Sequence, residues 1–156
     1  MHNIRTIAGS LLVTSVALLA ACGSSSNNAT APVTQPSNVP SFITNGTWAV
    51  SSLMQGTEDK ASQLSGFSFT FTATGSENGT VVATKGGTSV SGTWTHAPAV
   101  TYYGSSSTES IVLSLGTGSP FALLTKTWNV VSITTTTLTL VSPEVLEGMH
   151  LVFSRQ

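Results

Sequence analysis

Charged side chains are scarce in this sequence, where they make up 7% of 156 residues, against roughly 25% in an average soluble domain. The formal net charge is −1, which gives no field that would attract a nucleic acid or an anionic surface. We therefore exclude nucleic acids as partners. The surface of the folded part must be formed mainly by Ser, Thr, Asn and Gly.

Cysteine is nearly absent, since Cys22 is the single one in the sequence. A lone cysteine excludes an intramolecular disulfide, and its position before the folded part excludes a thiolate metal site or a cysteine nucleophile there.

Residues 1–21 are expected to be a signal peptide, with Arg5 as the positive region and an apolar stretch over 7–20. That stretch is shorter than the ~20 apolar residues that a membrane-spanning helix needs.

The stretch Leu19-Ala20-Ala21-Cys22 resembles the lipobox of bacterial lipoproteins. The resemblance implies that the Cys22 thiol carries a lipid, with acyl chains such as palmitate, and that cleavage makes Cys22 the mature N-terminus. The expected partner is then a membrane, because several acyl chains anchor a protein stably. The following residue is Gly23, which under the sorting rule of enterobacterial lipoproteins favours the outer membrane, with the protein either periplasmic or exposed on the cell surface.

Residues 22–41 follow as the lipidated cysteine and a linker. The linker is rich in Ser, Asn, Ala, Thr and Pro and has no charge and no apolar period, which indicates disorder. We expect one folded domain over 42–156, a length typical of a single domain.

From residue 42 onward, apolar residues alternate with Ser and Thr in short runs, and no long run has a helical period. In 66–74, three phenylalanines alternate with hydroxyl residues, so the apolar side chains face one side of a strand. About eight strands are predicted, at 46–54, 66–74, 79–85, 88–96, 109–116, 127–134, 137–142 and 149–155. The predicted fold is all-β, a single antiparallel up-and-down β-barrel, because closure removes exposed strand edges. A flat sandwich is the alternative, and pairing of the first and last strands would separate the two.

Turn residues separate the predicted strands. Asn78-Gly79 and Gly86-Gly87 are typical of tight hairpins, because both pairs supply the positive φ that such turns require. Glu147-Gly148 is predicted to turn the last hairpin. Single helical turns are expected within the connections at 56–65 and 121–125.

Gly46-Thr47-Trp48 at the head of the first strand, with Arg155 at the foot of the last, resembles the lipocalin arrangement. The resemblance implies that Trp48 closes one end of the barrel and that Arg155 packs across it. Further short motifs, Gly-Phe-Ser-Phe-Thr-Phe and Val-Ser-Gly-Thr-Trp among them, resemble the small lipocalin-like domains of Bacteroidetes lipoproteins, and the likeness covers 42–156.

Motifs of the common enzyme classes are missing. There is no Gly-x-Ser-x-Gly, no Gly-rich phosphate loop with a lysine and no His-Glu-x-x-His. After residue 22, histidine occurs only at His96 and His150, with no carboxylate at ligand spacing, which favours a hydrogen-bonded or surface histidine over a metal ligand. The carboxylate pairs Glu58-Asp59 and Glu144-Glu147 fall in predicted loops, where solvated charges are the rule. We therefore expect no enzymatic activity, no metal and no cofactor.

The inward faces of the predicted strands carry the candidates for lining a ligand site, which are Phe69, Phe71, Trp94 and Leu113. The resemblance implies a lipid-anchored cell-envelope protein that holds a small apolar molecule among such side chains. The same side chains also suffice to fill the interior as a core, whose burial accounts for stability without any ligand.

The alternative function is a protein-interaction module, or a barrel of the protease-inhibitor type, that acts through its loops. The long loop after residue 96 carries Tyr102 and Tyr103, which would then project toward a partner. An apolar pocket at one end of the barrel would favour the first function, and a closed, filled barrel would favour the second.

Overall fold

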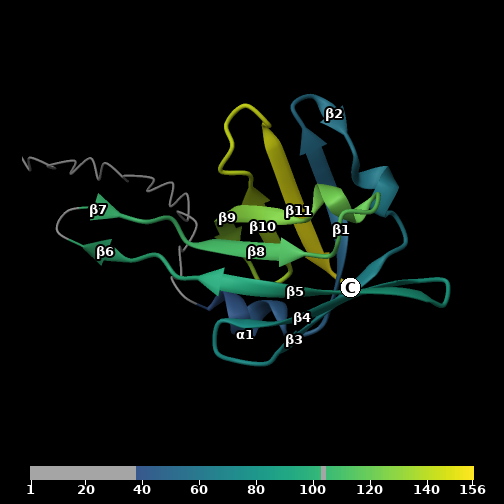
Figure 1. Cartoon of the computed structure of the whole chain (residues 1–156), viewed down its shortest axis with the longest axis horizontal. Helices are drawn as coiled ribbons and strands as arrows, with labels where there is room; N and C mark the ends of the chain where they lie inside the picture. Colours follow the sequence, from purple (N-terminus) through teal and green to yellow (C-terminus); the bar gives the residue numbers. More distant parts are fainter. Residues whose placement is uncertain (1–37, 103–104) are drawn as a thin grey trace, which may run out of the picture. The chain divides into compact units, whose positions relative to one another are not determined.

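The computed structural model describes residues 38–102 and 105–156, and in these ranges the chain is β-structure with three short helical segments (Figure 1). The predicted signal peptide, Cys22 and most of the predicted linker lie outside the described residues. The helical segments are α1 (Val39–Ile43), η1 (Ala61–Leu64) and η2 (Phe121–Leu123). The strands are β1 (Thr47–Gln55), β2 (Glu58–Asp59), β3 (Ser68–Ala73), β4 (Asn78–Lys85), β5 (Thr88–Ala97), β6 (Thr101–Tyr102), β7 (Ser105–Ser106), β8 (Ser110–Ser114), β9 (Lys126–Ile133), β10 (Thr137–Val141) and β11 (Met149–Arg155).

Eight of these strands form a closed barrel. Their order is β1-β3-β4-β5-β8-β9-β10-β11, each neighbour is antiparallel, and β11 pairs back onto β1. Three short strands are not part of this ring. Strand β2 pairs only with β1, and β6 and β7 pair only with each other. The predicted all-β, up-and-down barrel is thus confirmed, and the sandwich alternative is wrong.

The hairpin at Gly86-Gly87 is confirmed as predicted. Both glycines have positive φ, 56° and 83°, and the turn brings Lys85 opposite Thr88. A side chain at either position would be strained in this conformation. The tight turn therefore fixes the register of β4 against β5 over their whole length.

The turn expected at Asn78-Gly79 is wrong, because both residues lie inside β4 and the chain reverses at 74–77. Gly79 pairs across the sheet with Trp94, and a Cβ there would lie 2.7 Å from the indole nitrogen and 1.9 Å from the carbonyl oxygen of Thr72. The glycine leaves room for a buried tryptophan and its neighbouring backbone. Close packing, not turn geometry, explains this residue.

The folded part begins earlier than the predicted residue 42. Helix α1 includes 39–41, which we assigned to the linker, and it buries Val39 and Ile43 in the core. Two apolar residues four apart share one face of a helix, and Pro40 lies in the first turn, where its missing N–H costs nothing. The short helix thereby lies against one end of the barrel.

The interior of the barrel is filled by large apolar side chains. The fully buried set includes three tryptophans and two phenylalanines, namely Trp48, Trp94, Trp128, Phe69 and Phe153. Phe153 contacts both Phe69 and Phe71 edge-on, with ring centroids 5.4 and 5.9 Å apart. Such tilted contacts are the favoured geometry for aromatic pairs. The alternation of the sequence places Ser and Thr on the outer faces.

The connections alternate between the two ends of the barrel, as in any up-and-down topology. The α1 end is formed by α1, the turn 74–77, the connection 98–109 and the turn 134–136. The loop end is formed by the connections 56–67, 86–87, 115–125 and 142–148. At the α1 end, β6 and β7 form a narrow arm that extends beyond β5 and β8 (Figure 1).

Candidate functional site

Trp48 and Arg155 meet at the α1 end of the barrel. They are register partners between β1 and β11, and the guanidinium carbon of Arg155 lies 5.0 Å from the centre of the Trp48 ring. The indole N–H donates to the carbonyl oxygen of Ile43 at 2.7 Å. The Phe42 ring lies 4.9 Å from the Trp48 ring. This arrangement joins α1, the first strand and the last strand at one place.

The side chains proposed to line a ligand site lie in the core. Phe69, Phe71, Trp94 and Leu113 are between 0 and 3% exposed, so they border no space that admits water. They pack within one continuous cluster of buried side chains. Three pockets of the described part have none of these four residues in their lining; they lie beside Arg155, beside Ala61–Phe67 and beside 142–148. A ligand among the four residues would have to displace side chains already in contact.

His96 lies buried at the root of the β6–β7 arm, between two carboxylates. Its Nδ1 contacts the carboxylate of Glu77, and its Nε2 lies 2.8 Å from Oε1 of Glu109. The backbone N–H of His96 also donates to the carbonyl oxygen of Glu77 at 2.6 Å. Both ring nitrogens of His96 therefore have a carboxylate partner. The cluster thus ties the turn 74–77 and the start of β8 to the end of β5.

The expectation that His96 is hydrogen-bonded fits this geometry, but its two carboxylate partners were missed. They lie 19 and 13 positions away in sequence, so no local spacing indicates them. The signal that would have found one is the hairpin at Gly86-Gly87, whose register, continued by one residue beyond the Asn78–Thr95 pair, brings Glu77 opposite His96. In the described ranges no group of three or more His, Cys, Asp and Glu side chains is suited to hold a metal ion.

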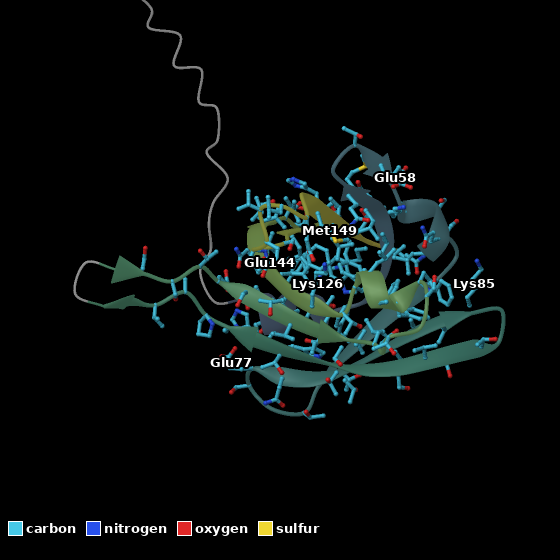
Figure 2. All side chains as sticks on the ribbon, turned by 45° about the horizontal axis from the view of Figure 1, so that its top comes forward. Glu58, Glu77, Lys85, Lys126, Glu144 and Met149 are labelled. Atoms are coloured by element: carbon cyan, nitrogen blue, oxygen red, sulfur yellow. The ribbon has the colours of Figure 1, made fainter. Side chains whose placement is uncertain are left out.

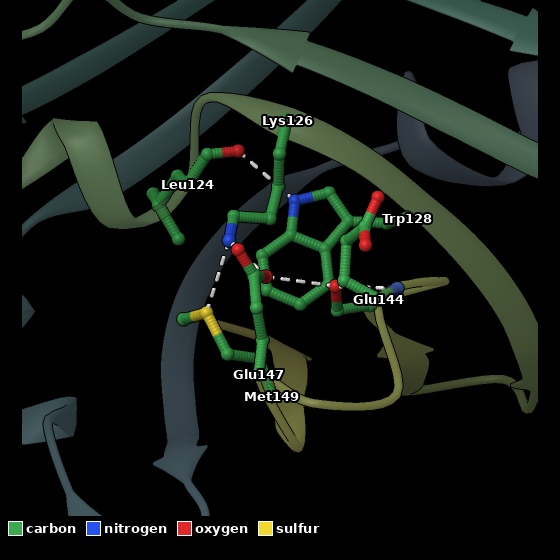
Figure 3. A network of polar contacts seen from close by, with 7 residues as sticks. Leu124, Lys126, Trp128, Glu144, Glu147 and Met149 are labelled. Atoms are coloured by element: carbon green, nitrogen blue, oxygen red, sulfur yellow. Dashed lines mark hydrogen bonds and ion pairs between the residues drawn. The ribbon is translucent and has the colours of Figure 1, made fainter.

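At the loop end, a polar network holds the connection 142–148 (Figure 3). The ammonium of Lys126 contacts the carboxylate of Glu147 and lies 3.1 Å from the sulfur of Met149. Ser142 donates its hydroxyl to Glu147 at 2.9 Å and accepts the backbone N–H of Glu144 at 3.1 Å. The turn is closed by the backbone N–H of Glu147, which donates to the carbonyl oxygen of Glu144 at 3.0 Å.

Within this network the hydrogen bonds to Glu147 stabilise its ionised form. The hydrogen bond from Lys126, followed by that from Ser142, lowers the pKa of Glu147 below its ordinary value of 4.5. A carboxylate with a lowered pKa is a weak general base, so Glu147 is poorly suited to take the proton of the Ser142 hydroxyl. We infer that Glu147 positions the loop.

The connection 142–148 presents two aliphatic side chains to solvent at its tip. Val145 is 90% exposed and Leu146 is fully exposed. A shallow pocket of about 160 Å³ lies beside them, lined by Lys126, Thr127, Ser142, Pro143, Glu144 and Glu147. Figure 2 shows Glu144, Lys126 and Met149 gathered on this part of the barrel, with Glu77 and Lys85 set apart from them. We call residues 142–148 the apolar-tipped loop.

No family model matches this chain. No curated protein matches it either. Among solved structures, the crystal structure of an uncharacterized protein from Bacteroides eggerthii is similar over 71% of this chain and 98% of that chain, with 12% sequence identity and a TM-score of 0.44.

Two further expectations concern attachment to a membrane. Cys22, the predicted lipid carrier, lies outside the described residues. Within the described part, the helices are all too short and insufficiently apolar to cross a membrane. Of the two tyrosines expected to project from the long loop, Tyr102 lies in β6, where its backbone pairs with that of Ser105. Tyr103 lies outside the described residues.

Proposed function

We propose that this protein is a lipid-anchored, lipocalin-like binding protein of the bacterial cell envelope, without catalytic activity, and that it engages a partner protein through its loops. The observation that carries the proposal is the packing of the barrel interior. Phe69, Trp94 and Leu113 are at most 1% exposed, and binding inside would require the loss of their mutual contacts. A small apolar ligand held in the interior is therefore the less favoured function.

The apolar-tipped loop is the surface that best suits a partner. Exposed aliphatic side chains contribute to affinity when they enter a pocket of the partner, and a rigid loop loses little entropy on binding. Val145 and Leu146 stand at the tip of a turn that Ser142 and Glu147 hold by side-chain hydrogen bonds. The expected partner site is an apolar pocket deep enough for two aliphatic side chains.

The anchor is proposed from the sequence. Leu19-Ala20-Ala21-Cys22 resembles a lipobox, and lipidation of Cys22 would place the barrel at the outer membrane. If the chain between Cys22 and Asn38 is a random coil, as its composition predicts, it would span roughly 20 Å on average. Such a linker allows the apolar-tipped loop to reach partners in the same membrane or beside it.

Site-specific photo-crosslinking in cells tests the proposed function. A benzophenone amino acid replaces Glu144 in the apolar-tipped loop or, as a control, Val131 on the outer barrel wall, which is 51% exposed. We expect one discrete protein adduct from position 144 and none from position 131. The adduct should disappear when Leu146→Asp is added, because a charge at the tip prevents entry into an apolar pocket.

Two results would contradict the proposal. One is an adduct from position 144 that persists with Leu146→Asp. The other is the same adduct from both probe positions, which would indicate nonspecific contact with the barrel wall.

A further inference from the structure

Among the residues that the structure describes, no carboxylate forms an ion pair with Arg155. The ion pairs of the described residues are Lys60–Glu58, His96–Glu77, His96–Glu109 and Lys126–Glu147, and none includes Arg155. Its Nη2 donates to the carbonyl oxygen of Phe42 at a long 3.5 Å. Its Nε is buried and has no hydrogen-bond partner. Because this Nε has no accessible surface, a ligand of Arg155 would have to contact the outer nitrogens of the guanidinium.

The two aromatic rings beside Arg155 hold its guanidinium in place but do not neutralise it. The guanidinium carbon lies 5.0 Å from the ring centres of both Phe42 and Trp48. These contacts keep the planar group rigid and partly remove it from water. A fixed, partly desolvated guanidinium attracts an anion more strongly than a flexible surface lysine does.

A pocket of about 340 Å³ opens at this guanidinium, roughly ten times the volume of a water molecule. Its lining residues are Asn38, Ser41, Phe42, Asn45, Thr135 and Arg155. Four of them have neutral side chains that donate hydrogen bonds, and none has a carboxylate that would repel an anion. One fixed cation surrounded by neutral donors suits a tetrahedral oxyanion.

We propose that this pocket, at the α1 end of the barrel, binds a phosphate group. The guanidinium of Arg155 supplies the charge, and Asn38, Ser41, Asn45 and Thr135 supply neutral donors around it. The phosphate has two possible sources, a soluble phosphate or the head group of a phospholipid. The second follows if Cys22 is lipidated, because the linker from Cys22 joins the barrel at Asn38, which lines the pocket.

Thermal unfolding of the full chain with increasing inorganic phosphate tests the site, at constant ionic strength set with chloride. At ten times the Kd we expect Tm to rise by about 5 °C. Fluorescence of Trp48 beside the guanidinium should change with the same saturation curve. Phosphate also stabilises proteins by exclusion from their surface, so the wild-type rise has to be compared with that of a matched variant.

The matched variant is Asn45→Asp, which leaves Arg155 in place and has nearly the shape of the natural residue. Its carboxylate should pair with the guanidinium, raise Tm without phosphate and remove the phosphate-dependent rise. Gln63→Glu, exposed in η1 at the loop end, adds the same charge elsewhere and should keep the full rise. An equal rise in the wild type, Asn45→Asp and Gln63→Glu would overturn the proposal.

A soluble head-group analogue separates the two sources of phosphate. Glycerophosphoglycerol is a phosphodiester with the polar part of phosphatidylglycerol and no acyl chains. Saturation by this diester within about threefold of the inorganic phosphate Kd would assign the site to a lipid head group. Saturation by inorganic phosphate alone would assign it to a soluble phosphate, and saturation by neither would overturn the proposal.

Discussion

Arg155 and Trp48 are partners in the strand register and also in a cation–π contact, with the guanidinium carbon 5.0 Å from the indole centre. The indole N–H of the same tryptophan donates to the carbonyl oxygen of Ile43, the last residue of α1. One side chain therefore connects the first strand, the last strand and the helix. Its removal should affect all three.

We expect Trp48→Ala to lower the free energy of unfolding by about 3–5 kcal/mol, because it removes a large buried side chain. Trp48→Phe should cost about 1–3 kcal/mol, since it keeps an aromatic ring but leaves the carbonyl oxygen of Ile43 without its donor. Urea denaturation measures both. Val145→Ala, at an exposed position, should stay within about 0.5 kcal/mol of the wild type. A fully stable Trp48→Ala would contradict the assigned role in closure.

A filled interior predicts weak binding of apolar probes. In the wild type, small apolar molecules such as indole should show no saturable effect on tryptophan fluorescence up to about 1 mM, equivalent to about −4 kcal/mol. Trp94→Ala should create a cavity that accepts indole, as apolar cavities in cores do. Tight, saturable binding by the wild type would instead favour an interior ligand and count against the loops as the binding surface.

His96 should be important for stability although it is far from the barrel closure. His96→Ala should lower the free energy of unfolding by about 2–4 kcal/mol, because it removes contacts to Glu77 and to the nearly buried Glu109. Amide hydrogen exchange should increase at Ala97 and Ser110, the last pair before the arm. His150→Ala, at an exposed position, is the control and should change neither measurement.

We expect the contribution of Glu147 to the free energy of unfolding to depend on pH. Its pKa is lowered in the folded state by Lys126 and then Ser142, so the stabilisation is complete above its ordinary pKa of 4.5 and is lost as pH falls through the lower, folded value. The urea midpoints of the wild type and Glu147→Gln should differ by a constant amount near neutral pH and begin to converge as the pH falls below 4.5. The difference should be small, because the Glu147 side chain is 38% exposed. If the difference between the two urea midpoints increased on acidification, the stabilising role of the Glu147 carboxylate would be refuted.

The predicted lipid anchor depends on one thiol. Cys22→Ala should accumulate as the unprocessed precursor and incorporate no labelled fatty acid, because the lipobox enzyme acts on the acylated cysteine. Ser24→Ala, two residues further on, should be processed and labelled as the wild type is. Cleavage of the Cys22→Ala protein at the normal position would show that the segment is an ordinary signal peptide.

Most of the barrel was predictable because its strands are half-buried. The alternation of apolar and hydroxyl residues marks each strand directly, and Gly86-Gly87 marks one turn. Helix α1 was missed since five residues are too few to show a helical period, and two buried residues in a Pro-containing, uncharged stretch are indistinguishable from linker. Gly79 was misassigned because its reason, the space beside Trp94, lies on another strand.

The polar clusters were out of reach for a related reason. Lys126 and Glu147 are 21 positions apart, and His96 and Glu77 are 19 apart. Sequence reasoning from local spacing finds pairs only within a turn or a helix face, whereas a barrel brings side chains together across strands. Register continued from the confirmed Gly86-Gly87 hairpin would have joined His96 and Glu77, whereas Glu147 lies in a connection between strands, where register does not place it.

The pairing of β1 with β11 also determines the order in which this protein must fold. It joins residues as far apart in sequence as Trp48 and Arg155, while β4 and β5 meet across a two-residue turn. Contacts between distant residues cost the most chain entropy and form late. Until that last seam forms, the nascent sheet has two unpaired edges with little charge to keep other chains away, so its slowest step is also the one in which it is most open to misassembly.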